Sequence, residues 1–93
     1  MLKYYSDGTI NLNDSIATII LEQQKDFTAK DITDVIFTAM HNHEDILFWS
    51  YEELERNVRR AIVRTYSNEM SPASYRLCTE VGNGVYRKKE ENS

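Results

Sequence analysis

The apolar residues of this chain change period once, near its only proline, Pro72. Before Pro72 the hydrophobic residues recur every three or four positions, which is the spacing of one buried helix face. After Pro72 apolar and polar residues alternate as in a strand, and the run ends at Gly82-Asn83-Gly84. Asn-Gly is the preferred two-residue connection of a β-hairpin. The chain is therefore predicted to place helices first and a two-stranded hairpin last.

The first predicted helix follows an extended lead-in. Residues 8–13 alternate apolar and polar side chains and can supply a short strand. The helix itself is expected to begin at a cap on Asn13 or Asp14, because these side chains accept hydrogen bonds from the first free amides. Its apolar spacing continues to about Gln24, where we expect it to end.

The second predicted helix has a sharper start. Thr28 is the expected cap, and Asp31 lies three residues later, where an acidic side chain can bond back to the cap amide. Phe27 and Ile32 are placed to form a hydrophobic staple around this start. The buried face is predicted to comprise Ile32, Val35, Ile36, Ala39 and Met40.

The third predicted helix spans about residues 50–68. Ser50 and Glu53 form a full capping box, and Trp49 and Leu54 can pack around it as a second staple. The helix is expected to end before Pro72, which cannot continue it. Its buried stripe is predicted to comprise Tyr51, Leu54, Val58, Ala61, Ile62 and Tyr66.

The strand before the Asn-Gly turn is predicted over residues 75–81. Its apolar face would consist of Tyr75, Leu77, Thr79 and Val81. If Asn83 and Gly84 are the two loop residues, both strands continue without interruption and their register is fixed. The expected cross-strand pairs are then Gly82 with Val85, Val81 with Tyr86, and Glu80 with Arg87 as a salt bridge.

Two stretches resemble a known family. Residues 14–21 (DSIATIIL) with residues 27–32 (FTAKDI) resemble the opening of the HARE-type winged helices, such as the N-terminal domain of the RNA polymerase delta subunit. Residues 75–77 (YRL) and 81–86 (VGNGVY) resemble the wing of the same group. The resemblance covers about residues 12–88, although the chain lacks the long acidic tail of the delta subunit. It implies a winged helix, in a family that includes both DNA-associated and polymerase-bound domains.

Together these observations predict an α+β fold of winged-helix type. A three-helix, helix-turn-helix core would carry a C-terminal two-stranded β-hairpin as its wing. The chain is interpreted as a single domain over residues 1–93, ordered from about 10 to 89, with a frayed tail at 90–93. A length of 93 residues suits one domain rather than two.

The cysteine content and the first residues of the chain indicate a cellular compartment. Cys78 is the only cysteine, so an internal disulfide is excluded, and a secreted domain this small would usually need several. The first residues do not form the apolar core of a signal peptide, and no apolar run reaches membrane-spanning length. We therefore expect a cytoplasmic protein without membrane contact, of a type that suits a bacterium or its phage.

The charged residues divide into two halves of opposite sign. Residues 1–55 contain three basic and eleven acidic side chains, whereas residues 56–89 contain eight basic and two acidic ones. Such an asymmetry within one domain indicates a charged partner or two halves that neutralise each other in the fold. The net charge of −4 argues against nonspecific attraction to nucleic acid.

The basic half contains the candidate binding residues. Arginines spaced four residues apart form one stripe on the third helix, and further basic residues follow the hairpin turn. A guanidinium can hold a guanine edge or a phosphate with two hydrogen bonds. The alternative is a solvated face with Glu52–Arg56 and Glu55–Arg59 salt bridges. The candidate nucleic-acid-binding residues are Arg56, Arg59, Arg60, Arg64, Asn83, Arg87, Lys88 and Lys89.

Two functions follow from these features. In the first, the chain is a small transcriptional regulator that reads duplex DNA with helix 50–68 and the wing at 75–89, and a homodimer is one expected form. In the second, it is a protein-interaction module of a phage or mobile element that binds or inhibits RNA polymerase or another nucleic-acid enzyme. The acidic first and second helices would then face a basic protein surface. The side chains concerned are Asp14, Glu22, Asp26, Asp31, Asp34, Glu44 and Asp45.

Features of an enzyme are sparse. The segment from His41 to Asp45 contains histidines and carboxylates, but a metal site would need a second ligand cluster, so a polar loop without metal is expected. Residues 46–49 are interpreted as core packing with the short strand of a winged helix, or alternatively as an exposed partner patch. Cys78 is expected to be a small packed residue. We predict no catalytic activity and no cofactor.

Overall fold

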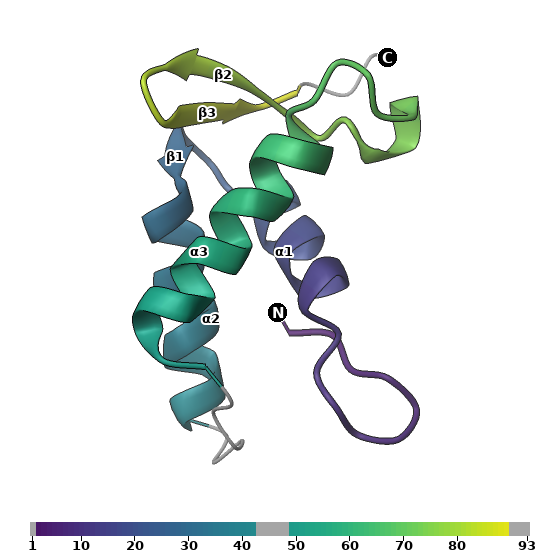
Figure 1. Ribbon diagram of the computed structural model, residues 1–93, viewed down its shortest axis with the longest axis vertical. Helices are drawn as coiled ribbons and strands as arrows, with labels where there is room; N and C mark the ends of the chain where they lie inside the picture. The colour runs from purple at the N-terminus through teal and green to yellow at the C-terminus, as the bar shows by residue number, and fades with distance from the viewer. Residues whose placement is uncertain (1, 43–48, 90–93) are drawn as a thin grey trace.

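The structure, a computed structural model, describes residues 2–42 and 49–89. Within these residues the chain forms helices α1 (Leu12–Leu21), α2 (Ala29–Asn42) and α3 (Tyr51–Ala61). The wider helical turn η1 (Ile62–Tyr66) continues α3 without a break, and it is closed by the Ser67 amide, which donates to the Ile62 carbonyl at 2.8 Å. In Figure 1, α3 crosses in front of α2, against which it packs, and α1 lies to the right of α2.

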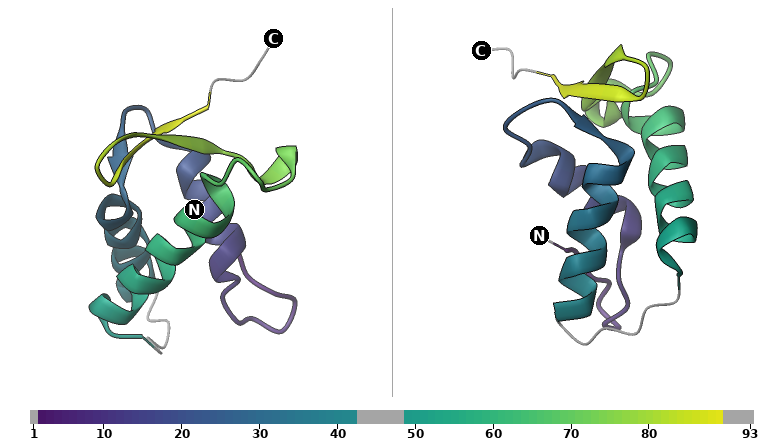
Figure 2. Two further views of the ribbon diagram at one scale, coloured as in Figure 1. Left: turned by 45° about the horizontal axis from the view of Figure 1, so that its top comes forward. Right: turned by 90° about the vertical axis from the view of Figure 1, so that its left-hand side faces the viewer.

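A small antiparallel sheet lies at one end of the helices. Its strands are β1 (Phe27–Thr28), β2 (Cys78–Gly82) and β3 (Val85–Lys88), and their order is β1-β3-β2. Figure 2 shows the β2–β3 hairpin crossing over the end of the helices. The molecule is thus an α+β fold of three helices and an antiparallel sheet, which is compatible with a winged helix.

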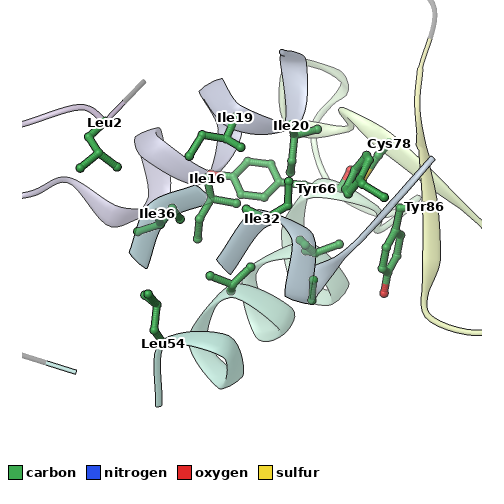
Figure 3. Close-up of a cluster of buried hydrophobic side chains, with 14 of the residues drawn as sticks. Leu2, Ile16, Ile19, Ile20, Ile32, Ile36, Leu54, Tyr66, Cys78 and Tyr86 are labelled. Atoms are coloured by element: carbon green, nitrogen blue, oxygen red, sulfur yellow. The ribbon is translucent and has the colours of Figure 1, made fainter. Parts of the chain in front are cut away.

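The hydrophobic core joins all three helices to the sheet. Helix spacing places Ile16 and Ile20 of α1 and Ile32 and Ile36 of α2 fully inside, as Figure 3 shows. Val35, expected on the buried face of α2, is instead 43% exposed because it lies on the side of the helix away from α1 and α3. The buried core residues of α3 and η1 are Leu54, Val58, Ile62 and Tyr66.

Both predicted capping boxes are present. The Thr28 amide donates to Asp31 at 2.9 Å, and the Asp31 amide donates to the Thr28 hydroxyl oxygen at 3.2 Å. Ser50 and Glu53 make the same reciprocal bonds at the start of α3. Each box satisfies amides that have no partner inside the helix, so the helix start is fixed by local residues.

The start of α1 differs from the prediction. The cap is Asn11, not Asn13 or Asp14, and its side-chain oxygen accepts from the Asp14 amide at 3.1 Å. The Asn11 amide also donates to the Lys3 carbonyl at 2.8 Å, and this contact with the N-terminal segment holds Asn11 extended. The helix ends at Leu21 rather than near Gln24, since the chain must turn back to pair β1 with β3.

The segment before α1 forms a hairpin-like loop rather than a continuous strand. Tyr4 and Ile10 form one isolated antiparallel bridge, and the Tyr5 amide donates to the Thr9 carbonyl at 2.7 Å. The buried Ser15 hydroxyl accepts from the Lys3 amide at 2.8 Å, which ties this loop to α1. The predicted strand at residues 8–13 is therefore reduced to a single bridge.

The hairpin turn is where the sequence predicts it, but the register beyond it is shifted. Asn83 and Gly84 form the turn, and Gly84 has a φ of 76°, a conformation that glycine adopts without strain. Gly82 pairs with Val85 as expected. Val81 is then the extra residue of a β-bulge, so every later pair moves by one position. The observed partners are Glu80 with Tyr86, Thr79 with Arg87, and Cys78 with Lys88.

The bulge also changes which side chains are buried. Tyr75 and Val81, expected on the apolar face, are 53% and 45% exposed, whereas Cys78 is buried at 1%. Tyr75 belongs to the short 3-10 helix η2 (Ala73–Tyr75), and β2 begins only at Cys78. Tyr86 of β3 is buried and packs against Phe27, with 6.0 Å between ring centroids.

Some predictions lie outside the described residues. These are the frayed tail at 90–93, the acidic residues Glu44 and Asp45, and the apolar segment 46–48. Trp49, at the end of that segment, forms a bend and packs half-buried against the core. None of the helices in the described ranges has the length and apolar character required to span a bilayer.

Candidate nucleic-acid interface

The arginine stripe lies on the outer face of α3 and η1. Packing of Leu54, Val58 and Ile62 against the core fixes the rotation of this helix. Residues on the opposite side therefore point to solvent, as predicted. The exposed residues of this face are Arg56, Arg59, Arg60, Val63 and Arg64.

Most of this stripe is not neutralised by salt bridges. Arg59 contacts Glu55 at 3.5 Å across one helical turn, as the salt-bridge alternative predicts. The other pair expected from that alternative, Glu52–Arg56, is not formed. Among the residues that the structure describes, Arg56, Arg60 and Arg64 make no ion pair. Three guanidinium groups therefore remain available to an anionic partner.

The basic residues of β3 behave differently, beginning with Arg87. Its guanidinium donates to both carboxylate oxygens of Asp26, at 2.9 and 3.1 Å. This bidentate contact lowers the pKa of Asp26 below its ordinary value. Lys88 donates from Nζ to the Leu21 carbonyl at 2.9 Å, at the end of α1. Both side chains thus hold the sheet to the α1–β1 connection.

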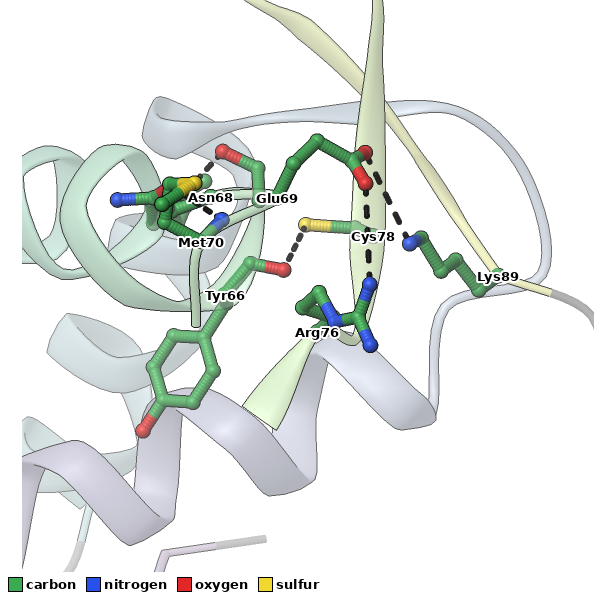
Figure 4. A network of polar contacts seen from close by, with 9 residues as sticks. Tyr66, Asn68, Glu69, Met70, Arg76, Cys78 and Lys89 are labelled. Carbon is green, nitrogen blue, oxygen red and sulfur yellow. Dashed lines mark hydrogen bonds and ion pairs between the residues drawn. The ribbon is translucent and has the colours of Figure 1, made fainter. Parts of the chain in front are cut away.

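Lys89 also contacts the body of the protein. Figure 4 shows the Glu69 carboxylate between Lys89 and Arg76, with nitrogen–oxygen distances of 3.9 Å to each. Exposed pairs at this distance are weak, so they orient the side chains more than they stabilise the fold. The three basic residues predicted for the wing therefore all contact protein groups, which are carboxylates for Arg87 and Lys89 and a backbone carbonyl for Lys88.

Asn83 and Arg59 line one surface pocket. The pocket has a volume of about 320 Å³ and lies between the start of α2, the outer face of α3 and the hairpin turn. Lys30 and Val63 contribute to its wall, and Val63 is 52% exposed. The pocket thus places two basic side chains and an amide beside an exposed valine and the carboxylate of Glu80, which accepts from the Gly84 amide at 3.0 Å.

Lys30 was missed by the sequence interpretation. It is one of three basic residues in the acidic half, and it lies on a helix that contains two aspartates. Its proximity to Arg59 arises only from the packing of α2 on α3, so no local pattern could have indicated it.

The acidic residues of α1 and α2 are exposed, but several have structural partners. Asp31 caps α2, and Asp34 accepts a hydrogen bond from the Tyr51 hydroxyl. Burial, followed by this contact with Asp34, raises the pKa of Tyr51 to about 12. Asp14 accepts from the Asn11 side chain at 2.9 Å. These carboxylates are spread over the surface rather than gathered in one cluster.

The groups considered for catalysis and metal binding do not converge. Cys78 is buried under η1, where its thiol lies 3.6 Å from the Tyr66 carbonyl (Figure 4). Burial raises the pKa of this thiol to about 11, which keeps it in the unreactive protonated form. His41 stacks on Phe37 with 6.4 Å between ring centroids. No group of three or more histidine, cysteine or carboxylate side chains within residues 2–42 and 49–89 is arranged to hold a metal ion.

The geometry of the described residues therefore leaves one basic surface with unpaired groups, on α3 and beside the hairpin turn. In comparisons with known proteins, no family model, no curated protein and no solved structure matched this chain.

Proposed function

We propose that the chain is a small DNA-binding regulator whose α2 and α3 act as a helix-turn-helix, with the β2–β3 hairpin as the wing. The observation that supports this most directly is the row of Arg56, Arg60 and Arg64 on the outer face of α3 and η1. They point to solvent and have no acidic partner in the described chain. An α-helix fits the major groove of duplex DNA, and such a row can contact bases and flanking phosphates there.

The orientation of α3 on DNA follows from its charge distribution. The N-terminal turn contains Glu52 and Glu53, which are exposed and would be repelled by phosphates. The C-terminal half contains the arginines and the exposed Val63, whose methyl groups can contact a thymine methyl. The proposed contact is therefore centred on the C-terminal half of α3 and on η1.

The hairpin contributes through its turn rather than its basic strand. Asn83 lies at the exposed tip and shares a pocket wall with Lys30 and Arg59. An asparagine there can donate to a phosphate or to a groove edge. Arg87 and Lys88 are engaged with the α1–β1 connection, so their role in this proposal is to position the wing.

The test is binding of the purified protein to random-sequence duplex DNA at about 50 and about 200 mM salt, followed by sequencing of the bound fraction. A DNA reader is expected to lose affinity steeply between the two salt concentrations and to enrich one sequence motif. A folded protein that binds no duplex at the lower salt concentration would contradict the proposal.

A second candidate function is supported by the exposed acidic surface. Glu22 at the end of α1, Asp26 before β1 and Asp31 in the first turn of α2 are exposed. Such a surface suits a basic face on a protein such as RNA polymerase. Charge reversal of α1 and α2 residues that have no capping role would abolish this activity and leave DNA binding unchanged.

A further inference from the structure

Three tyrosines from distant parts of the chain line a single pocket. Tyr5 comes from the N-terminal loop, Tyr66 from η1 and Tyr75 from η2, and the pocket has a volume of about 310 Å³. Asp14, in the first turn of α1, lines the same pocket. The remaining lining residues are Asn11, Asn13 and Thr65.

The pocket is built by contacts that fix its walls. The Tyr66 hydroxyl donates to the Asn13 carbonyl at 2.9 Å, which directs the ring toward α1 as Figure 4 shows. The N-terminal loop is tied to α1 through Ser15, so Tyr5 stays beside the start of that helix. Tyr75 follows Pro72, whose carbonyl accepts from the Tyr75 amide at 2.9 Å and closes the short turn of η2.

The exposure of the rings suggests a function beyond core packing. Tyr66 is buried, but Tyr5 and Tyr75 are 56% and 53% exposed. Large aromatic rings left in solvent around one hollow are suited to contact a partner. Tyrosine faces carry negative electrostatic potential, so they attract a cation placed over the ring.

The carboxylate of Asp14 in the pocket is negative, and the faces of the tyrosine rings also carry negative electrostatic potential. Burial, the Asp14 charge and Tyr75 raise the pKa of Tyr66 above its ordinary value. Asp14 forms no ion pair with any residue in the described ranges, and its carboxylate accepts a hydrogen bond from the Asn11 side chain. The pocket thus combines aromatic faces with a carboxylate that lacks a cationic partner.

We infer that this pocket is a binding site for the ammonium group of a lysine side chain presented by a basic protein. The exposed rings of Tyr5 and Tyr75 would flank the methylene stem and the cation, Tyr66 would form part of the pocket wall, and Asp14 would supply the opposite charge. The site is lined by residues of the N-terminal loop, α1, η1 and η2, and its lining includes no arginine of the stripe on α3 and η1. The inference therefore does not depend on the proposed DNA contact.

The experiment is a titration of the isotope-labelled protein with an unstructured peptide of alternating lysine and glycine, followed by NMR. The same peptide with every lysine acetylated serves as the probe without charge. The lysine peptide is expected to shift the ring signals of Tyr5 and Tyr75 and the amide signals around Asn13. The acetylated peptide is expected to leave them unchanged.

Variants separate the pocket from general acidity. Asp14→Asn and Tyr75→Leu are each expected to weaken peptide binding by about threefold to fivefold, and together by about tenfold or more. Tyr75→Phe keeps the ring face and is expected to bind like the native protein. Glu52→Gln removes an acid from the first turn of α3, as Asp14→Asn does from α1, and is the matched control with unchanged binding.

Two results would overturn the inference. One is equal binding of the acetylated peptide, since this would show that the cation is not recognised. The other is native affinity in the Asp14→Asn, Tyr75→Leu double variant, with folding verified by its melting temperature. Both substitutions fall on exposed residues, so the variant is expected to fold.

Discussion

The arginines of α3 and the basic residues of β3 look equivalent in sequence but differ in the structure. Arg56, Arg60 and Arg64 project from the outer face of a helix and meet no carboxylate in the described chain. By contrast, Arg87 is held by two hydrogen bonds to Asp26, and Lys88 donates to the Leu21 carbonyl. The count of basic residues therefore overstates the charge that is available to a partner.

The difference arises from what lies opposite each element. The buried stripe of α3 directs its arginines away from the rest of the protein. The hairpin instead crosses the end of the helices, where the acidic connection before β1 lies within reach of Arg87 (Figure 2). The proposed DNA contact is therefore expected to depend on the arginines of α3 and η1, whereas the basic residues of β3 hold the hairpin to the α1–β1 connection.

The largest effect is expected from removal of the free arginines. Replacement of Arg56, Arg60 and Arg64 by alanine removes three charge-assisted contacts to DNA, each worth about tenfold in affinity. Duplex affinity at low salt is expected to fall by about a thousandfold, and the slope of log affinity against log salt by about 2 to 3. Fluorescence anisotropy at several salt concentrations measures both quantities. A folded triple variant with native affinity and slope would refute the assignment.

The reactivity of Cys78, at the start of β2, reports whether the base of the hairpin stays packed against η1. The pKa of Cys78 is raised from 9.0 to about 11, so its thiolate fraction at about pH 8 is roughly 100-fold lower than that of a free thiol. Alkylation by iodoacetamide is expected to be slower by at least that factor in the native protein than in urea. Rapid labelling of the native protein would show that β2 leaves the body and releases the basic side chains of β3.

A smaller effect is expected from the hairpin cations. Replacement of Arg87, Lys88 and Lys89 by alanine removes the same charge as the α3 variant, and so provides its matched control. Because these side chains contact protein groups, duplex affinity is expected to fall by less than about threefold. The slope of log affinity against log salt is expected to change only modestly. A loss as large as that of the α3 variant would remove the distinction between the two regions.

The smallest effect concerns the pH dependence of the Asp26–Arg87 contact. The hydrogen bond from Arg87 lowers the pKa of Asp26 in the folded protein, while the unfolded value stays near 3.8. This contact therefore stabilises the fold above the unfolded pKa, and its contribution is lost as the pH falls through the lower folded value. Melting temperatures between about pH 5 and about pH 2 are expected to fall slightly less in Asp26→Asn than in the native protein. An equal or steeper fall in the variant would show that the contact is absent in solution.

The features that sequence predicted well depend on neighbouring residues. The Thr28–Asp31 and Ser50–Glu53 boxes and the Asn83–Gly84 turn each involve residues within a few positions of one another. Their hydrogen bonds and backbone conformations involve residues close in sequence, so residue type and spacing are sufficient to identify them.

The features that sequence did not predict depend on distant contacts. The strand β1 has two residues and is defined only by its pairing with Tyr86 and Val85. The bulge at Val81 leaves no sequence signal, yet it moves Arg87 out of register with Glu80 and toward Asp26. The tyrosine pocket joins three segments of the chain, so its composition is visible only in the folded protein.

The most direct test of the account is a map of amide chemical-shift changes when duplex DNA is added to the isotope-labelled protein. If the arginine stripe contacts DNA, the largest changes are expected over residues 56–64 of α3 and η1 and at Lys30 and Asn83, with little change at Asp26 and Lys88. Changes concentrated on residues 86–89, with α3 unaffected, would contradict this contact.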